Sequence, residues 1–295
     1  MSNFVLSCCS IADLTPEHLN ERNVSFARFH YFMDDVEYTD DMGQSLSSAD
    51  FYAAMEKGAE VRTSQVNVEE FTQYFDTFLS DGQDVLHLSL SSGLSGSYNS
   101  ARIAAEMLQE KYPDRKLYVV DTLGASAGVG LMMETLADMR DAGGDIDHLH
   151  DWIEAHKLEM HHWFTASDLT WFVKGGRVTK AAGWFGTALR ICPVLNMDYA
   201  GRLIPRFKIR GIQKALKELV NQMEEAATNG NDYDGKCFLS HSNCEGLART
   251  VAVEIEKRFP LLSGKVGIYN IGTTIGCHTG PGTVALFFWG KPRTN

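Results

Sequence analysis

Short apolar runs alternate with amphipathic helical patterns through the first half of the chain. Phe4-Val5-Leu6 is followed by a polar turn and by Ala12-Asp13-Leu14-Thr15-Pro16, a pattern that predicts a strand, a turn and a helix. Further strands are predicted at 85–90 and 117–121, each followed by a polar connection and a helix. Strands alternating with helices indicate a parallel, doubly wound sheet with helices on both faces. Ligands of such sheets bind at the carboxyl ends of the strands.

One helix in this half is marked by both its start and its apolar face. Asn67 is a good N-cap, with Glu70 three residues further on. Apolar residues then recur at near 3.6-residue spacing on one face, namely Val68, Phe71, Phe75, Phe78 and Leu79.

The pattern changes in the second half of the chain. Apolar runs at 193–197 and 203–207 flank Asp198-Tyr199-Ala200-Gly201, which predicts a hairpin. A long helix at 212–227 follows, and the strands expected after it lie at 237–240, 266–269 and 284–289. We therefore predict an α/β protein with two domains. Residues 1–155 would form a Rossmann-like parallel domain, and residues 156–295 an α+β domain with a mixed or antiparallel sheet covered by helices on one side.

Composition and charge narrow the possible partners. The 295 residues carry a net charge of -11, which argues against nucleic acid or an anionic membrane surface as the main partner. No run approaches the roughly 20 apolar residues of a membrane span, and the first ten residues do not resemble a secretory signal. We expect a cytoplasmic protein. The six cysteines are too sparse for a disulfide scaffold or a zinc site and are expected to be free, mostly buried thiols.

The Ser/Gly run at 91–97 follows a predicted strand and precedes a helix, a place where N–H groups and hydroxyls face an anion. It lacks the Gly-Lys-Ser/Thr of a phosphate loop. A hydrolase elbow needs Gly-x-Ser-x-Gly, but in Gly93-Leu94-Ser95-Gly96-Ser97 a serine replaces the second glycine. The remaining interpretations are that Ser95 donates to a bound carboxylate or phosphate, or that the run only caps the helix.

Two other segments could add polar groups. Thr63-Ser64-Gln65 precedes a helix and is either a cap or a source of further hydroxyl donors at the same sheet edge. The glycine-rich stretch at 272–282 contains one proline and predicts a loop that holds a single histidine, His278. That histidine could donate to a carboxylate, act as a base, or satisfy backbone carbonyls.

Basic and histidine-rich stretches offer less specific signals. Five histidines fall at 148–162 without the spacing of a metal motif, so solvent or interdomain positions are expected for His148, His150, His156, His161 and His162. Residues 167–177 predict a capped short helix ending at glycine. Arg177, at its end, is either structural or faces an anionic partner.

Taken together, the ordered motifs resemble one known family. The Ser/Gly run 91–101, the segment from Leu169 to Gly175-Gly176-Arg177, and the stretch 276–282 occur in the order found in the DegV family of bacterial fatty-acid-binding proteins, which serve fatty acid kinase. The resemblance covers about residues 3 to 290. Two departures are visible: Ser7-Cys8-Cys9-Ser10 stands where the family has Thr-Asp-Ser, and Val66-Asn67 follows Thr63-Ser64-Gln65 where the family has Pro-Ser.

The resemblance implies a carrier rather than an enzyme. It would hold one long-chain fatty acid of the palmitate, stearate or oleate type, with the tail in an interior tunnel and the carboxylate bound by hydroxyls. The family motifs imply that Thr63 and Ser95 bind the carboxylate, with His278 nearby. Together with their motif neighbours, the ligand-binding candidates are Thr63, Ser64, Ser92, Gly93, Ser95, Gly96, His278 and Thr279.

The resemblance also implies a partner. A separate kinase subunit would bring ATP and magnesium, so this chain itself would need no cofactor or metal. Arg177 and Arg210 are candidates for docking that kinase. The alternatives are a lipid-cleaving serine hydrolase that uses Ser95 and His278, and a binding module for another amphiphile.

Overall fold

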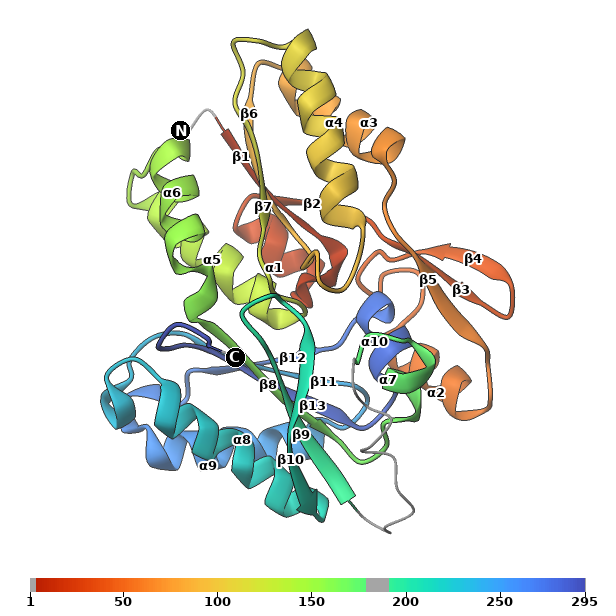
Figure 1. Cartoon of the computed structure of the whole chain (residues 1–295), viewed down its shortest axis with the longest axis vertical. Coiled ribbons are helices and arrows are strands. Elements are labelled where there is room, and N and C mark those ends of the chain that lie inside the picture. Colours follow the sequence, from red (N-terminus) through yellow and green to blue (C-terminus); the bar gives the residue numbers. More distant parts are fainter. Residues whose placement is uncertain (1–3, 179–190, 295) are drawn as a thin grey trace.

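The computed structural model describes residues 4–178 and 191–294 and begins with a four-stranded parallel sheet of order β2-β1-β6-β7. Its strands are β1 (Phe4–Cys9), β2 (Val24–Ala27), β6 (Asp84–Ser89) and β7 (Leu117–Asp121). The helices that accompany it are α1 (Pro16–Glu21), α3 (Val68–Ser80), α4 (Ser97–Lys111), α5 (Ala127–Asp141) and α6 (Ile146–His156). Helices α3 and α4 cover one face, and α5 and α6 cover the other (Figure 1). The predicted doubly wound sheet is confirmed.

A small antiparallel sheet of order β4-β3-β5 was not predicted. It is built from β3 (His30–Met33), β4 (Val36–Thr39) and β5 (Val61–Ser64), with α2 (Ser48–Glu56) between the last two strands. Each strand has only four residues, too few to show a clear alternation. Thr63 and Ser64 lie in β5, a strand that the sequence analysis did not predict.

The second large sheet is mixed, with the order β10-β9-β8-β13-β11-β12. Its strands are β8 (Met160–Ala166), β9 (Ile191–Met197), β10 (Leu203–Arg210), β11 (Cys237–His241), β12 (Val266–Asn270) and β13 (Thr283–Trp289). The predicted hairpin is confirmed as the antiparallel pair β9 and β10. Helices α8 (Ile212–Ala226) and α9 (Glu245–Arg258) cover one face.

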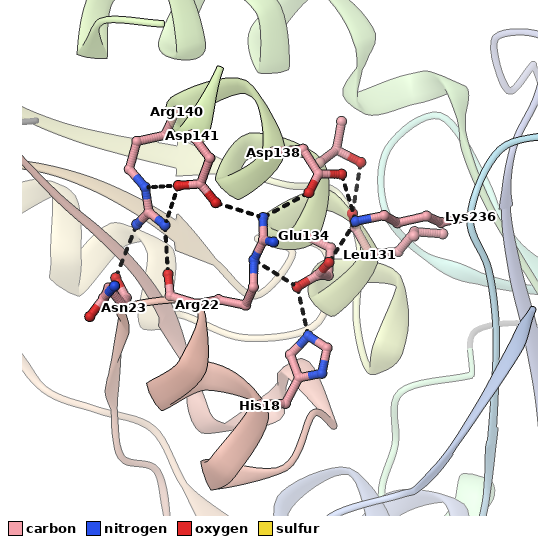
Figure 2. Close-up of polar contacts among 10 residues, drawn as sticks. His18, Arg22, Asn23, Leu131, Glu134, Asp138, Arg140, Asp141 and Lys236 are labelled. Atoms are coloured by element: carbon pink, nitrogen blue, oxygen red, sulfur yellow. Dashed lines mark hydrogen bonds and ion pairs between the residues drawn. The ribbon is translucent and has the colours of Figure 1, made fainter. Parts of the chain in front are cut away.

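Helix α5 lies between the two large sheets, because it contacts β1 of the first and β8, β11 and β13 of the second. An ion-pair cluster fixes its outer end (Figure 2). Glu134 of α5 accepts hydrogen bonds at 2.6 Å from both His18 Nε2 and Lys236 Nζ, and Asp138 binds Arg22 at 2.7 Å. Burial would raise the pKa of Glu134, but the bonds from Lys236 and His18 outweigh it and leave that pKa lowered. The cluster ties α1, α5 and the start of β11 together.

The predicted boundary near residue 155 falls at the end of α6, just before β8. The division into two domains stays a prediction. No helix among residues 4–178 and 191–294 is long and apolar enough to cross a membrane. All six cysteines are free, and all except Cys244 are buried, as expected.

Two local expectations need correction. The glycine-rich stretch that holds His278 is not a loop, because Thr273–Thr279 forms helix α10. A glycine in this helix allows close packing: a Cβ at Gly276 would lie 2.6 Å from the Tyr52 hydroxyl. The expected solvent or interdomain position is also wrong for His161, which is buried and stacks on Phe288.

Candidate functional site

A cavity of about 410 Å³ lies between the two large sheets. This volume is within the range of small-molecule sites. Its apolar lining comes from the ends of β6 and β7, from β8, β9, β10 and β13, and from the segments beside them: Phe29, Leu90, Leu94, Ala125, Phe164, Phe172, Met197, Leu203, Ile271, Ile275, Ala285 and Phe287. The cavity thus lies at the carboxyl ends of β6 and β7, where the sequence predicts a ligand.

Thr63 and His278 meet in the polar part of this lining. Thr63 Oγ1 of β5 lies 2.8 Å from Nε2 of His278 on α10. Burial, together with the charge of Arg177, lowers the pKa of His278 to about 4. The ring is therefore neutral near pH 7, with one nitrogen donating and the other accepting. Its Nδ1 is buried and has no hydrogen-bond partner in the part of the chain that the structure describes.

Ser95 supplies a second hydroxyl to the same cavity. Its Oγ accepts a hydrogen bond from the Ser97 N–H at 3.2 Å and lies 2.8 Å from Ser97 Oγ. The carboxamide of Gln65 packs directly against Gly96, where a side chain would collide with it. The end of β5 and the Ser/Gly run therefore lie side by side at the cavity.

Other candidates differ in how far the structure brings them to this site. Thr279 lines the cavity, and its buried Oγ1 has no partner among the described residues. Gly96 and Arg177 also line it. The following candidates do not contribute to the lining: Ser64, Ser92, Gly93 and Arg210. For the first three, a role in binding the ligand stays a prediction.

The candidates outside the cavity lining contact other parts of the protein or lie exposed at its surface. Gly93 packs against the backbone of the β9–β10 turn, where a Cβ would lie 2.7 Å from the carbonyl oxygen of Ala200. Ser92 is exposed, and its N–H donates to Asp121 Oδ1. Arg210 is exposed at the end of β10.

The sequence did not reveal two buried carboxyl groups behind the lining. Asp13 Oδ2 accepts a hydrogen bond from Ser126, a lining residue with φ of 57°, and Asp13 Oδ1 accepts from Gly272 N–H at 2.8 Å. Asp40 accepts from both the N–H and the hydroxyl of Thr274. Burial raises the pKa of Asp13 to about 7 and also raises that of Asp40. Both carboxyl groups fasten the first turn of α10, and Asp13 also fixes part of the cavity wall.

The structure offers little support for hydrolytic or metal chemistry. A serine hydrolase needs its nucleophile bonded to the base, but Ser95 bonds to Ser97 and His278 to Thr63. Within residues 4–178 and 191–294, no group of three or more His, Cys, Asp or Glu side chains is placed to hold a metal ion. The arrangement can instead hold an amphiphile whose anionic head faces neutral hydroxyls.

The fold and the site thus define a class: an α/β protein with two large sheets, an interior apolar cavity and a cluster of hydroxyl groups. The sequence profile of the DegV family, described as an uncharacterised protein family, matches residues 9–291, and the chain belongs to this family. The sequence is 36% identical to a DegV domain-containing protein of Clostridium perfringens over 99% of both chains. It is 29% identical to a protein of Thermotoga maritima named a fatty acid-binding protein, over 94% of each chain.

Comparison with a solved structure also places the fold in this family. A DegV family protein of Thermus thermophilus, described by its fatty acid binding, superposes with a TM-score of 0.84 at 25% sequence identity. The match covers 97% of this chain and 99% of the other. The fold predicted from the sequence is therefore confirmed as that of the family.

Proposed function

We propose that this chain binds one long-chain fatty acid in the interior cavity and presents its carboxylate to a separate kinase subunit. The observation that carries this proposal is the mainly apolar lining of the interior cavity, interrupted by hydroxyls that include those of Thr63 and Ser95. The fatty acid binding named for the Thermotoga and Thermus relatives supports the same ligand class.

The tail supplies most of the binding free energy. Burial of a methylene group contributes about 0.8 kcal/mol, so about 14 methylenes contribute on the order of 11 kcal/mol before the costs of association. Palmitate, stearate and oleate have tails of this length. The head group then needs only enough polar contacts to offset its desolvation.

The hydrogen bonds at the head group follow from the neutral state of His278. A carboxylate only accepts hydrogen bonds, so Thr63 must donate its hydroxyl proton to it. His278 must then donate its Nε2 proton to Thr63 Oγ1, across the 2.8 Å contact. In the same way, the Ser97 hydroxyl donates to Ser95, which leaves the Ser95 proton for the ligand. Thr279 offers a further hydroxyl, since its oxygen has no partner in the described chain.

Neutral donors suit a carboxylate that has to react. In the proposed transfer, a carboxylate oxygen attacks the γ-phosphorus of ATP held by the kinase, and the bond from that phosphorus to the β,γ-bridging oxygen breaks. ADP leaves, and an acyl phosphate forms without a proton being taken up or released. The need for ATP would place this function in the cytoplasm. Arg177 and Arg210, both exposed, are our candidates for contacts with the kinase.

Native mass spectrometry and calorimetry of the purified protein test the first half of the proposal. We expect one fatty acid per chain, and weaker palmitate binding in Ser95→Ala. Ser80→Ala, at an exposed serine that ends α3, serves as the matched control and should bind as the parent does. A delipidated protein that rejects palmitate, stearate and oleate would contradict the proposal.

Adding the kinase, ATP and magnesium tests the second half. Acyl phosphate is trapped with hydroxylamine as a hydroxamate, and its yield should require this chain, the fatty acid and the kinase together. Equal yield in the absence of this chain would show that it does not present the substrate.

A further inference from the structure

A second pocket adjoins the main cavity on the outer side of the head-group residues. It has a volume of about 230 Å³ and shares three lining residues with the main cavity: Thr63, Arg177 and His278. The hydrogen-bonded pair of Thr63 and His278 is therefore a common wall with a space on each side. A group attached to a carboxylate bound at Thr63 has this outer pocket beside it.

The outer pocket contains cations that are held in place by aromatic rings. The guanidinium carbon of Arg62 lies 3.6 Å from the ring centroid of Phe32, and Lys174 Nζ lies 5.5 Å from the ring centroid of Trp171. All four of these side chains line the pocket. Stacking on a ring favours one position of a flexible cation, so less freedom is lost when it binds an anion.

The balance of charge in the lining also favours an anion. Arg62, Lys174 and Arg177 face two carboxylates, Asp35 and Glu60, while His278 is neutral. The Asp35 side chain is 97% exposed and lies 3.8 Å from Arg62, so water screens that ion pair strongly. An excess of positive charge here contrasts with the net charge of -11 on the whole chain.

We propose that the outer pocket binds the phosphoryl group of an acyl phosphate whose tail occupies the main cavity. This inference rests on the proposed function. Phosphorylation adds a dianionic group to a carboxylate oxygen. The phosphorus then lies one bond beyond the oxygen that Thr63 and Ser95 are proposed to bind. Neutral hydroxyls suffice for the carboxylate, whereas a phosphoryl dianion calls for Arg and Lys donors. Arg62 and Lys174 supply them, with Arg177 at the boundary between the two spaces.

The subsite gives the carrier a way to hold its product. Transfer to the carboxylate removes the negative charge that the inner hydroxyls bound and places two negative charges further out. Without cations at that position, the product would be held by its tail alone. With them, the protein distinguishes the acyl phosphate from the free acid, a difference that a binding measurement can detect.

The test uses the methylene isostere of palmitoyl phosphate, in which a methylene group replaces the bridging oxygen so that the probe cannot hydrolyse. Its affinity and that of palmitate are measured by calorimetry with the full chain. Arg62→Gln and Lys174→Gln should each weaken binding of the isostere by about tenfold and leave palmitate affinity within about twofold. Arg28→Gln is the matched control, because Arg28 is also an exposed arginine over a phenylalanine ring, that of Phe26, but does not line this pocket.

Salt provides an independent readout. Affinity for the isostere should fall more steeply with ionic strength than affinity for palmitate, and this difference should shrink in Lys174→Gln. Unchanged binding of the isostere in both variants overturns the subsite while leaving palmitate binding, and hence the proposed function, intact. If the parent protein did not bind palmitate at all, the proposed function itself would be contradicted.

A third set of binding measurements distinguishes an acyl phosphate from other phosphate-containing ligands. Inorganic phosphate and ATP, tested alone, should bind far more weakly than the isostere, since neither has a tail for the cavity. Tight binding of ATP that depends on Arg62 would overturn the assignment to an acyl phosphate and give the pocket to a nucleotide.

Discussion

Thr63 and His278 are 215 positions apart in the chain, yet their side chains are joined by a hydrogen bond of 2.8 Å. Thr63 lies on β5 of the small sheet, and His278 lies on α10, which precedes the last strand of the second large sheet. The proposed head-group site therefore forms only when distant parts of the chain have folded together. Its integrity can be tested both by ligand binding and by stability.

Removal of the Thr63 hydroxyl should weaken fatty acid binding and also cost about 1–3 kcal/mol of stability, because it leaves the partly buried Nε2 of His278 without its partner. Thr63→Val keeps the shape of the side chain and its β-branching but loses the proton donated to the carboxylate. A hydrogen bond to a charged group contributes about 1.5–3 kcal/mol, so the Kd for palmitate should rise by roughly tenfold to a hundredfold. Isothermal titration calorimetry measures this directly.

The matched control for this substitution is Thr39→Val. Thr39 lies on β4 of the same small sheet, is exposed, and does not line the cavity. It should bind palmitate as the parent protein does. If both variants bound equally well, Thr63 would not be a ligand of the carboxylate.

A large side chain in the cavity should shorten the preferred ligand. Ala285 on β13 is buried and lines the apolar wall, so Ala285→Phe fills space that the tail would occupy. We expect the affinity for palmitate to fall much more than the affinity for decanoate. A competition assay with fatty acids of increasing length measures the profile. An unchanged profile would place the tail elsewhere in the molecule.

The contact between Gly280 and Trp171 should be essential for the packing of α7 (Thr170–Lys174) on α10. Gly280 has φ of 67°, and a side chain there would collide with the indole ring. With ψ of 177°, Gly280 lies in a region that is essentially restricted to glycine, so Gly280→Ala should cost about 1–3 kcal/mol of backbone strain and a further 1–3 kcal/mol of steric conflict. Urea unfolding measures the loss.

Gly82→Ala isolates the backbone contribution. Gly82 has φ of 75°, and nothing lies within 4 Å of the place that a Cβ would occupy there. The free energy of unfolding of Gly82→Ala should therefore fall by the backbone strain alone, without a steric conflict. Equal destabilisation of the two variants would mean that Trp171 moves aside at no cost, and that the contact does not hold α7 on α10.

The sequence predicted those parts of the fold that depend on neighbours in the chain. The capping box of α3 is an example, because Asn67 Oδ1 accepts from Glu70 N–H at 3.0 Å, and Glu70 Oε2 accepts from Asn67 N–H at 2.7 Å. Most strands of both large sheets were also predicted, from runs of apolar residues, but β2 and β8 were not. The residues that specify such a cap or such a strand are close neighbours in the chain, so a single sequence suffices to predict these elements.

Features that depend on distant contacts could not be predicted in this way. Helix α10 contains a glycine within seven residues and is held by Asp13, Asp40 and Tyr52, all more than 200 positions away. Thr63, Ser95 and His278 were each candidates from their own segments, but only the family resemblance placed them together at one carboxylate. The part that Asp13 plays in holding the cavity wall could not be predicted either, because its partner Ser126, 113 positions further on, gives no local signal.

The stability of the protein should depend on pH through Asp13. Burial raises the pKa of Asp13 in the folded chain to about 7, against 3.8 for an ordinary aspartate. Between these values the folded state binds more protons than the unfolded state, so this contribution to stability is full below about pH 4 and is lost as the pH rises through 7. Asp13→Asn removes the titration. At about 1.4 kcal/mol per pH unit, the free energy of unfolding of the parent protein relative to the variant should fall by about 3 kcal/mol from pH 5 to pH 8.

Urea unfolding of both proteins at several pH values measures this difference. His278 and His161 also titrate, each with a pKa lowered to about 4 by burial, but both are present in the two proteins and cancel in the comparison. Asp76→Asn is the control: hydrogen bonds from Lys111 and Tyr112 hold the pKa of this surface carboxyl below its ordinary value, so it should show no comparable trend from pH 5 to pH 8. If the difference between the parent and Asp13→Asn were constant from pH 5 to pH 8, Asp13 would be ionised throughout. Its bonds to Ser126 and Gly272 would then outweigh its burial.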